Sequence, residues 1–482
     1  MALDGRGAVR PDGGEGVTKR PNVLLVLSDQ HRASATGCYG NPDVRTPRLD
    51  AFAAQGVRVE TAVATTPVCG PSRACLMTGS YAHRCGYLTN ELPFRPHGPC
   101  LAEVFRAAGY ACGYVGKWHL HFPTGANGNF VPPDARHGFA DFWAAFNGQH
   151  RYHRWQLYRG ENPVPQEIVD YQPEVEVDLA LEFVEQQQRA GRPWLLVLAW
   201  GPPHTPFDPP PGYAEHYADV SVPPDVPEGQ PAEYAKRTLP AYYGLVESLD
   251  VAFGRLLAGV DRLQATGDTV VAYTSDHGEM MGAHGYRGNK RWPYAAALRV
   301  PLLVRWPGRI PAGRLTADPV CIPDLFPTLA DLAGLAPPAG LDGRSRSTAL
   351  LGAGADDSGQ AVDGPPGTPE FVLCSMPYGY VPWPGWRAIR SARYLYARTR
   401  QDPWLLYDYA ADPWEQHNLV QEKGQRSLRE ELDAALTAMM VEAGDSWDLA
   451  TNEGDWRNWL PGSQKMKHND LGVPWPGSGI RA

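Results

Sequence analysis

The chain has 482 residues, of which 43% are hydrophobic and 20% charged, and its formal net charge is −9 at pH 7. This composition is typical of a globular protein, and the length allows more than one structural unit. Because nucleic-acid phosphates require a basic surface, the negative charge excludes a general nucleic-acid binder. We also expect no membrane partner, since no run approaches the roughly 20 apolar residues that cross a bilayer.

Residues 1–20 contain no apolar stretch of the kind found in secretory signals, and we predict that they form a disordered tail. The eight cysteines include no Cys-x-x-Cys pair, which favours reduced thiols over a disulfide framework. Both features lead us to expect a cytoplasmic protein. Whether it forms an oligomer is left open.

Four apolar runs have the pattern of buried strands, and polar groups follow each of them. The pairs of run and polar group are 22–28 with Asp29, 110–115 with Lys117 and His119, 193–200 with His204, and 269–274 with Asp276 and His277. Helical patterns over 46–54, 101–108, 234–263 and 322–334, and a further strand over 299–304, complete this part of the chain. The alternation predicts an α/β fold with a large, mostly parallel central sheet flanked by helices.

The remainder of the chain differs in composition from this first part. We predict a catalytic α/β unit over 21–351, a linker or loop rich in Gly and Pro over 352–368, and an irregular extension over 445–482. Between the last two, residues 369–444 show short strand patterns and one helical stripe. These patterns predict a smaller C-terminal unit made of an antiparallel sheet and a helix.

Ligands in parallel sheets bind beyond the carboxyl ends of the strands, where the polar groups listed above are expected to converge. Asp29, Gln30 and Asp276 offer oxygen ligands and His277 offers a nitrogen. Oxygen donors favour a divalent cation, with Ca²⁺ first and Mg²⁺ as an alternative, and the histidine admits Mn²⁺.

A second informative pattern begins at Cys69. Pro71 suits the first turn of a helix, so Cys69 is expected at the helix N-terminus, where an anion or a thiolate is stabilised. The run Cys69-Gly70-Pro71-Ser72-Arg73, followed by Thr78-Gly79, resembles the signature of the type I sulfatases of the alkaline phosphatase superfamily. Further blocks in the same order, up to Leu406-Tyr407-Asp408 and the run 412–419, extend the resemblance over roughly residues 21 to 420.

The resemblance implies specific roles for these side chains. It implies that a formylglycine-generating enzyme converts Cys69 to formylglycine, whose hydrate attacks the sulfur of a sulfate ester. It also implies Asp29, Gln30, Asp276 and His277 as metal ligands together with residue 69, and Arg73 as a brace for that residue. Finally, it implies that Lys117 and Lys290 bind sulfate oxygens, that His119 contacts the nucleophile, and that His204 protonates the leaving alcohol.

These implied roles agree with the demands of the reaction. Cleavage of a sulfate ester places negative charge on the bridging oxygen, so an acid and nearby cations stabilise the transition state. The second hydroxyl of the hydrate loses its proton to expel sulfate, a step that a serine could not perform. We therefore expect hydrolysis of a small-molecule or saccharide sulfate monoester.

Two positions depart from the family pattern. Gln30 stands where many sulfatases have a second aspartate, and together with His277 it resembles the choline-sulfatase-like and the phosphonate or phosphodiester hydrolase branches. Ala295 stands where a glutamate is usual, and the sequence offers no mechanistic reason for this change. A phosphonate monoester or phosphodiester hydrolase with the same nucleophile is therefore an alternative, and an unmodified, non-catalytic anion-binding protein is another.

The identity of the ester is not specified by the sequence. Aromatic and histidine side chains gather at 142–158 and again at 378–386. Aromatic faces in these segments would either stack on a sugar or aryl group or pack in the core of inserted loops. Both interpretations are left open.

Overall fold

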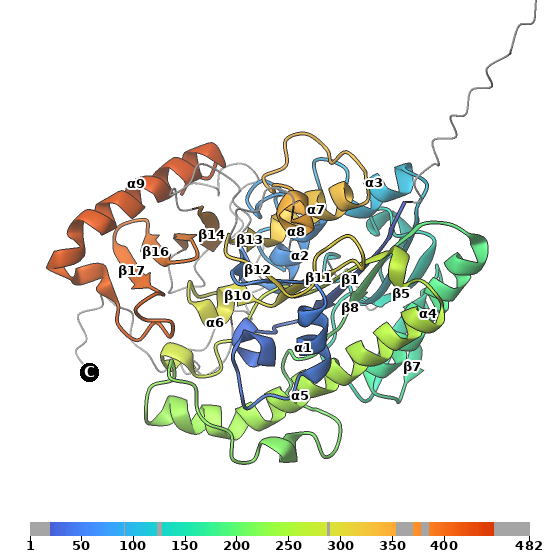
Figure 1. The fold of residues 1–482 in the computed structure, drawn as a ribbon, viewed down its shortest axis with the longest axis horizontal. Coiled ribbons are helices and arrows are strands. Elements are labelled where there is room, and N and C mark those ends of the chain that lie inside the picture. The colour runs from blue at the N-terminus through green and yellow to red at the C-terminus, as the bar shows by residue number, and fades with distance from the viewer. Residues whose placement is uncertain are drawn as a thin grey trace, which may run out of the picture.

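The computed structural model describes residues 20–90, 92–122, 128–286, 290–352, 370–376 and 385–447. Within these residues a ten-stranded sheet forms the centre of the molecule (Figure 1). Its strands in spatial order are β12 (Arg314–Thr316), β2 (Val57–Val59), β11 (Leu302–Arg305), β9 (Thr269–Ser275), β1 (Asn22–Ser28), β8 (Trp194–Ala199), β4 (Ala111–Lys117), β5 (Phe142–Phe146), β6 (Trp155–Arg159) and β7 (Gln166–Ile168). The middle strands β9, β1, β8, β4 and β5 all pair in parallel, which confirms the predicted mostly parallel sheet.

Helices cover both faces of this sheet because its central strands are apolar on both sides. Along β1, Leu24 and Val26 belong to the core beneath α1 (Pro47–Ala54), α4 (Gln172–Ala190) and α5 (Gln230–Arg262). The alternate residues Val23, Leu25 and Leu27 belong to the core on the opposite face. That core is shared with α2 (Cys69–Thr78), α3 (Leu101–Ala107), α7 (Leu325–Leu332) and α8 (Ser347–Leu351).

A small sheet and the C-terminal unit extend the molecule on one side (Figure 1). The small sheet has the order β10 (Arg299–Val300), β3 (Ala62–Val63) and β13 (Val320–Cys321), and the short helix α6 (Ala295–Leu298) leads into it. The C-terminal unit consists of an antiparallel sheet and a helix, as predicted. Its elements are β14 (Val372–Met376), β15 (Trp386–Arg390), β16 (Tyr394–Thr399), β17 (Pro403–Asp408) and α9 (Arg426–Glu442).

The structure differs from the sequence expectations in several elements. The strand expected over 299–304 is divided at Pro301 into β10 and β11, which belong to different sheets, because proline cannot donate a ladder hydrogen bond. The helix expected over 322–334 begins with a 3₁₀ turn at Ile322–Asp324 before α7. Finally, the strands β5 and β6 were not predicted, since the many aromatic residues at 142–158 suggested inserted loops, and α4 was not predicted either.

Several predicted segments lie outside the described residues. They are the tail apart from Arg20, the linker from residue 353 onward, the extension from residue 448 onward, and the aromatic residues Tyr378, Tyr380 and Trp383. The predicted unit boundaries therefore stay predictions. Of the helices in the described part of the chain, none combines the length and apolarity needed to cross a membrane.

Candidate active site

Four neighbouring strands of the central sheet end at one place. Asp29 directly follows β1, and Asp276 directly follows β9. Lys117 is the last residue of β4, and His204 lies five residues beyond β8. Because β9, β1, β8 and β4 are adjacent and parallel, their carboxyl ends bring these side chains to the same edge of the sheet.

Cys69 faces this edge from the first turn of α2. Val68 is the extended N-cap residue, so Cys69 is the first helical residue and Pro71 lies in the first turn, where its missing N–H costs no helical hydrogen bond. Every residue of α2 is buried, and Ser72 Oγ donates to the carbonyl of Asp276. The helix is thereby joined directly to the end of β9.

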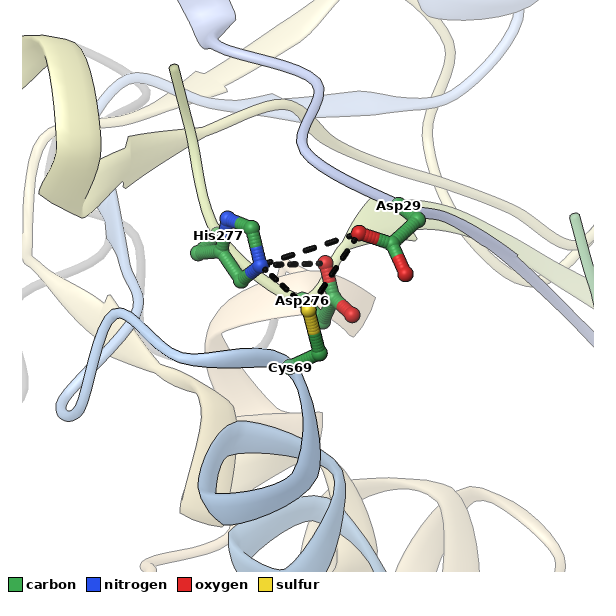
Figure 2. A group of neighbouring side chains, drawn as sticks. All are labelled: Asp29, Cys69, Asp276 and His277. Atoms are coloured by element: carbon green, nitrogen blue, oxygen red, sulfur yellow. Dashed lines mark hydrogen bonds and ion pairs between the residues drawn. The ribbon is translucent and has the colours of Figure 1, made fainter. Parts of the chain in front are cut away.

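The ligand atoms of Asp29, Cys69, Asp276 and His277 all lie within 4.8 Å of one another (Figure 2). Cys69 Sγ is 3.1 Å from His277 Nε2 and 3.6 Å from Asp29 Oδ1. His277 Nε2 is 3.7 Å from Asp29 Oδ1 and 3.6 Å from Asp276 Oδ1. Ligands held at about 2.3–2.6 Å from one cation lie roughly 3–4 Å apart, so these side chains fit a divalent ion.

Arg73 and Lys117 neutralise the two carboxylates from the side opposite His277. The Arg73 guanidinium donates to Asp276 Oδ2 at 2.9 Å, to Asp29 Oδ2 at 3.2 Å and to the carbonyl of Lys117 at 2.5 Å. Lys117 Nζ donates to Asp29 Oδ2 at 2.5 Å. Each carboxylate therefore uses one oxygen for these cations and turns the other toward Cys69 and His277.

Gln30 connects the proposed metal ligands to a third carboxylate, that of Glu279. Its backbone N–H donates to Asp276 Oδ1 at 3.1 Å, and its amide nitrogen donates to the buried Glu279. Its amide oxygen accepts from Lys290 Nζ at 2.7 Å. An aspartate or glutamate at position 30 would instead place a negative charge near Glu279, so the amide suits this neighbour.

Lys290 and His204 form the remaining wall beside the nucleophile position. Lys290 Nζ lies 3.1 Å from Cys69 Sγ and 2.8 Å from His204 Nε2. His204 Nδ1 contacts the carbonyl of Thr205 at 2.7 Å. Since a carbonyl can only accept, Nδ1 carries a proton, and a second proton would bind at Nε2, beside Cys69. Burial and the charge of Lys290 lower the pKa of His204 to about 4.

His119 lies on the other side of Cys69. Its backbone has a positive φ of 57°, and its N–H donates to the carbonyl of Asn147 at 2.7 Å, which fixes the turn after β4. Burial, followed by the charge of Lys117, lowers the pKa of His119.

The charges of the site favour an anion at position 69. Burial raises the pKa of the Cys69 thiol, but the charges of Lys117, Lys290 and His277 outweigh burial and hold this pKa well below its usual value. Burial and the charge of Asp29 raise the pKa of Asp276. Asp29, Asp276 and an anion at position 69 would supply the negatively charged ligand atoms that a divalent cation requires.

The structure thus brings together every residue predicted for the site, although their chemical roles stay predictions. Sequence reasoning did not single out Asn90, whose side chain accepts from the N–H of Gly70 at 2.9 Å. It named His150 within an aromatic group but gave it no role, and its ring stacks on His204 at 4.0 Å between centroids. The nearby aromatic residues Trp143, Phe146, Trp155 and Tyr158 are buried in β5 and β6. For those four, core packing is the correct interpretation.

Comparison of the chain with known proteins identifies one family. The family model described as Sulfatase matches residues 21–335. An ulvan-active sulfatase of Formosa agariphila is 34% identical over 437 residues, covering 89% of this chain and 82% of the relative. An N-acetylglucosamine-6-O-sulfatase of Bacteroides thetaiotaomicron is 24% identical over 535 residues, covering 91% of this chain and 90% of the relative.

A solved structure shares the fold as well. The crystal structure of yidJ from Bacteroides fragilis superposes with a TM-score of 0.80 at 26% identity, covering 89% of this chain and 97% of that one. The family model spans the strands and the helix that carry Asp29, Cys69, Lys117, His204 and Asp276. The chain belongs to the sulfatase family and is a sulfuric ester hydrolase of the alkaline-phosphatase-like fold.

Proposed function

We propose that this sulfatase hydrolyses a saccharide sulfate monoester to an alcohol and sulfate, with formylglycine hydrate made from Cys69 as the nucleophile and one divalent cation. The observation that carries the proposal is the position of Cys69 Sγ. It lies at the N-terminus of α2, within 3.1 Å of both His277 Nε2 and Lys290 Nζ, and 3.6 Å from Asp29 Oδ1. An anionic nucleophile and the sulfate group of the substrate would both be stabilised there.

Asp29, Asp276 and His277 would hold the cation, with Gln30 Oε1 as a neighbouring oxygen. The oxygen donors favour Ca²⁺, with Mn²⁺ or Mg²⁺ as alternatives. A bound cation would lower the pKa of the nucleophilic hydroxyl and neutralise charge on the substrate. Arg73 orients Asp29 and Asp276 by donating to the outer oxygen of each carboxylate, and its charge favours their ionised forms.

Maturation of Cys69 would require a formylglycine-generating enzyme. The hydrate would supply one hydroxyl to attack sulfur and a second hydroxyl whose deprotonation expels sulfate. In this reaction the His119 ring would hydrogen-bond residue 69. The low pKa of the thiol shows that the side chains around position 69 already favour an anion there.

Lys117 and Lys290 would bind the sulfate oxygens, and His204 would protonate the leaving oxygen from Nε2. Both lysines are buried, so their interaction with an anion would be screened little by solvent. His204 Nε2 lies 2.8 Å from Lys290 Nζ, and a bound sulfate would offset the Lys290 charge that lowers the pKa of His204, which would favour a proton on Nε2. An acid located there acts on charge that develops only in the transition state.

The proposed substrate class rests on the relatives. The relative from Bacteroides thetaiotaomicron is named for an N-acetylglucosamine 6-O-sulfate, and its match covers 91% of the present chain. The His150 ring stacks on His204 in the wall of the site, and a ring nitrogen of His150 can hydrogen-bond a sugar hydroxyl group. A saccharide ester is therefore the substrate that we propose to test first.

Side-by-side kinetics test the proposed reaction. Protein produced together with a formylglycine-generating enzyme is assayed on N-acetylglucosamine 6-O-sulfate, an aryl sulfate, an aryl phosphonate monoester and an aryl phosphodiester. We expect the highest kcat/KM on one of the two sulfate esters. A higher kcat/KM on either phosphorus ester would overturn this assignment in favour of the phosphonate or phosphodiester hydrolase, which the glutamine at position 30 keeps as the second candidate.

A further inference from the structure

Glu415 is a buried side chain of the C-terminal unit that has no part in the reaction proposed above. It lies in the block 412–419, in the connection between β17 and α9, and is 3% exposed. Its backbone has a positive φ of 56°, and the hydroxyl of Tyr409 donates to its carboxylate. The carboxylate is directed out of the C-terminal unit and contacts residues of the catalytic unit.

Two of those contacts flank the proposed sulfate ligand Lys290 in the sequence. The N–H of Ala295 donates to both oxygens of Glu415, at 3.0 and 3.1 Å. On the other side, His284 Nε2 lies 3.2 Å from Glu415 Oε2, and the His284 ring stacks on Tyr294 at 3.9 Å between centroids. One carboxylate thus connects residues that precede and follow Lys290.

The C-terminal unit makes a further contact with the same segment. Trp386, the first residue of β15, donates from its indole N–H to the carbonyl of Arg291 at 2.8 Å. Arg291 is the residue after Lys290 and has a positive φ of 87°, a conformation that an L-residue adopts only when its surroundings hold it. From Lys290 to Ala295, the backbone is therefore fixed at both ends by side chains of the C-terminal unit.

Helix α6 also packs against the backbone that follows His277, one of the proposed metal ligands. The N–H of Gly278 donates to the carbonyl of Ala297 at 2.8 Å, and a Cβ added to Gly278 would lie 2.0 Å from the carbonyl oxygen of Ala296. The backbone after His277 thus lies directly against the helix whose first N–H Glu415 accepts. Ala295 makes its polar contact with Glu415 through its backbone N–H, whichever side chain stands at position 295.

We propose that Glu415 is a positioning residue for Lys290. Lys290 Nζ contacts Gln30, Cys69 and His204 at 2.7–3.1 Å, and these contacts require the ammonium group to be placed within a few tenths of an ångström. Misplacement of a catalytic group by about 1 Å can cost on the order of 100-fold in rate. This inference rests on the proposed role of Lys290 in binding sulfate.

A double-mutant cycle on the full-length matured protein tests the inference. With 4-nitrophenyl sulfate as the probe, we expect Glu415→Ala to lower kcat/KM about 10- to 100-fold in the wild-type background. In the Lys290→Ala background the same change is expected to cost less than about 3-fold, because the group that Glu415 positions is absent. Equal losses in both backgrounds would overturn the inference and leave Glu415 a general structural residue.

Asp433→Asn is the matched control. Asp433 also belongs to the C-terminal unit and accepts a tyrosine hydroxyl, from Tyr396 at 2.8 Å, but its side-chain partners Tyr396 and Arg398 both lie within that unit. We expect Asp433→Asn to leave kcat/KM unchanged. If Glu415→Ala does not fold, the isosteric Glu415→Gln replaces it in the cycle, with an expected loss of about 3- to 10-fold.

Hydrogen exchange separates this inference from the proposed function. We expect the amide exchange of a peptide covering 290–298 to become at least about 10-fold faster in Glu415→Gln and to stay unchanged in Asp433→Asn, because Glu415→Gln removes the negative charge and one of the two oxygens that accept from the Ala295 N–H. Unchanged exchange in Glu415→Gln would overturn the inference. Full activity of Lys290→Ala would instead contradict the proposed role of Lys290, while the exchange result would still decide whether Glu415 holds this segment.

Discussion

Two fully buried arginines, Arg73 in the active site and Arg387 in the C-terminal unit, differ in how completely their carboxylate partners are satisfied. Arg387 binds one carboxylate, Asp445, through two nitrogens, and its other donors contact the carbonyls of Met376, Trp386 and Ser446. The Trp447 ring covers its guanidinium at 4.7 Å. Charge and hydrogen bonds are matched within that cluster.

Arg73 binds two carboxylates but contacts only one oxygen of each. One oxygen each of Asp29 and Asp276 accepts from Arg73, while the other faces Cys69 and His277. Burial lowers the pKa of His277, but the charges of Asp276 and Cys69 together outweigh burial and raise this pKa. The difference shows that burial of a charged group does not by itself indicate function, whereas convergence of partly unmatched ligand atoms does.

Replacing each arginine by alanine is expected to separate the two cases most strongly. Both Arg73→Ala and Arg387→Ala leave a buried carboxylate without its partner, so each should lower the free energy of unfolding by about 3–5 kcal/mol. Only Arg73→Ala should also lower kcat per folded molecule, by about 10²–10³-fold, since it disturbs groups that stabilise the transition state. Denaturant unfolding combined with active-site-normalised kinetics measures both effects. Equal kcat values for the two variants would contradict the comparison.

Removal of divalent ions should affect only the active-site cluster. Addition of CaCl₂, MgCl₂ or MnCl₂ to chelator-treated protein is expected to raise the free energy of unfolding by about 2.7 kcal/mol when the free ion reaches 100 times its Kd. Asp29→Asn should abolish this stabilisation, and Arg387→Ala should retain it. Thermal unfolding followed by calorimetry provides the measurement. A stabilisation that persists in Asp29→Asn would place the ion elsewhere.

Gln30→Glu sharpens the comparison with a smaller effect. The new carboxylate would lie against Glu279 in place of an amide donor, so we expect a loss of about 1–3 kcal/mol in the free energy of unfolding and weaker Ca²⁺ stabilisation. Gln172→Glu is the matched control, because Gln172 of α4 is likewise buried and donates its amide to the buried Glu176 at 2.7 Å. The control should lose similar stability and keep its response to Ca²⁺. An unchanged Ca²⁺ response in Gln30→Glu would remove Gln30 from the ion's surroundings.

The sequence predicted those parts of the fold and site that depend on local patterns. β1 was predicted at its observed bounds because an uninterrupted apolar run followed by Asp29 has few alternatives. The positions of Cys69 and Pro71 in the first turn of α2 followed from the preferences of proline. For the same reason, the polar residues after parallel strands could be assigned to one edge of the sheet.

The contacts between distant segments could not be predicted in this way. Nothing local to Glu415 indicates that its carboxylate accepts from Ala295, which lies 120 residues earlier in the chain. The stacking of His150 on His204 depends on how the connections after β5 and β8 lie against each other. α4 was overlooked because its apolar stripe includes the buried polar residues Gln172 and Glu176, which obscure the helical period.

Mass spectrometry of the peptide that contains residue 69 provides the most direct test of the proposed chemistry. Samples with different degrees of maturation are prepared by varying co-production of a formylglycine-generating enzyme, and each is assayed on a sulfate ester. We expect an aldehyde in place of the Cys69 thiol and a kcat that rises in proportion to the aldehyde fraction. Full activity in protein that retains only the thiol at residue 69 would contradict the account, and an unmodified, inactive product from every preparation would favour a non-catalytic anion-binding protein.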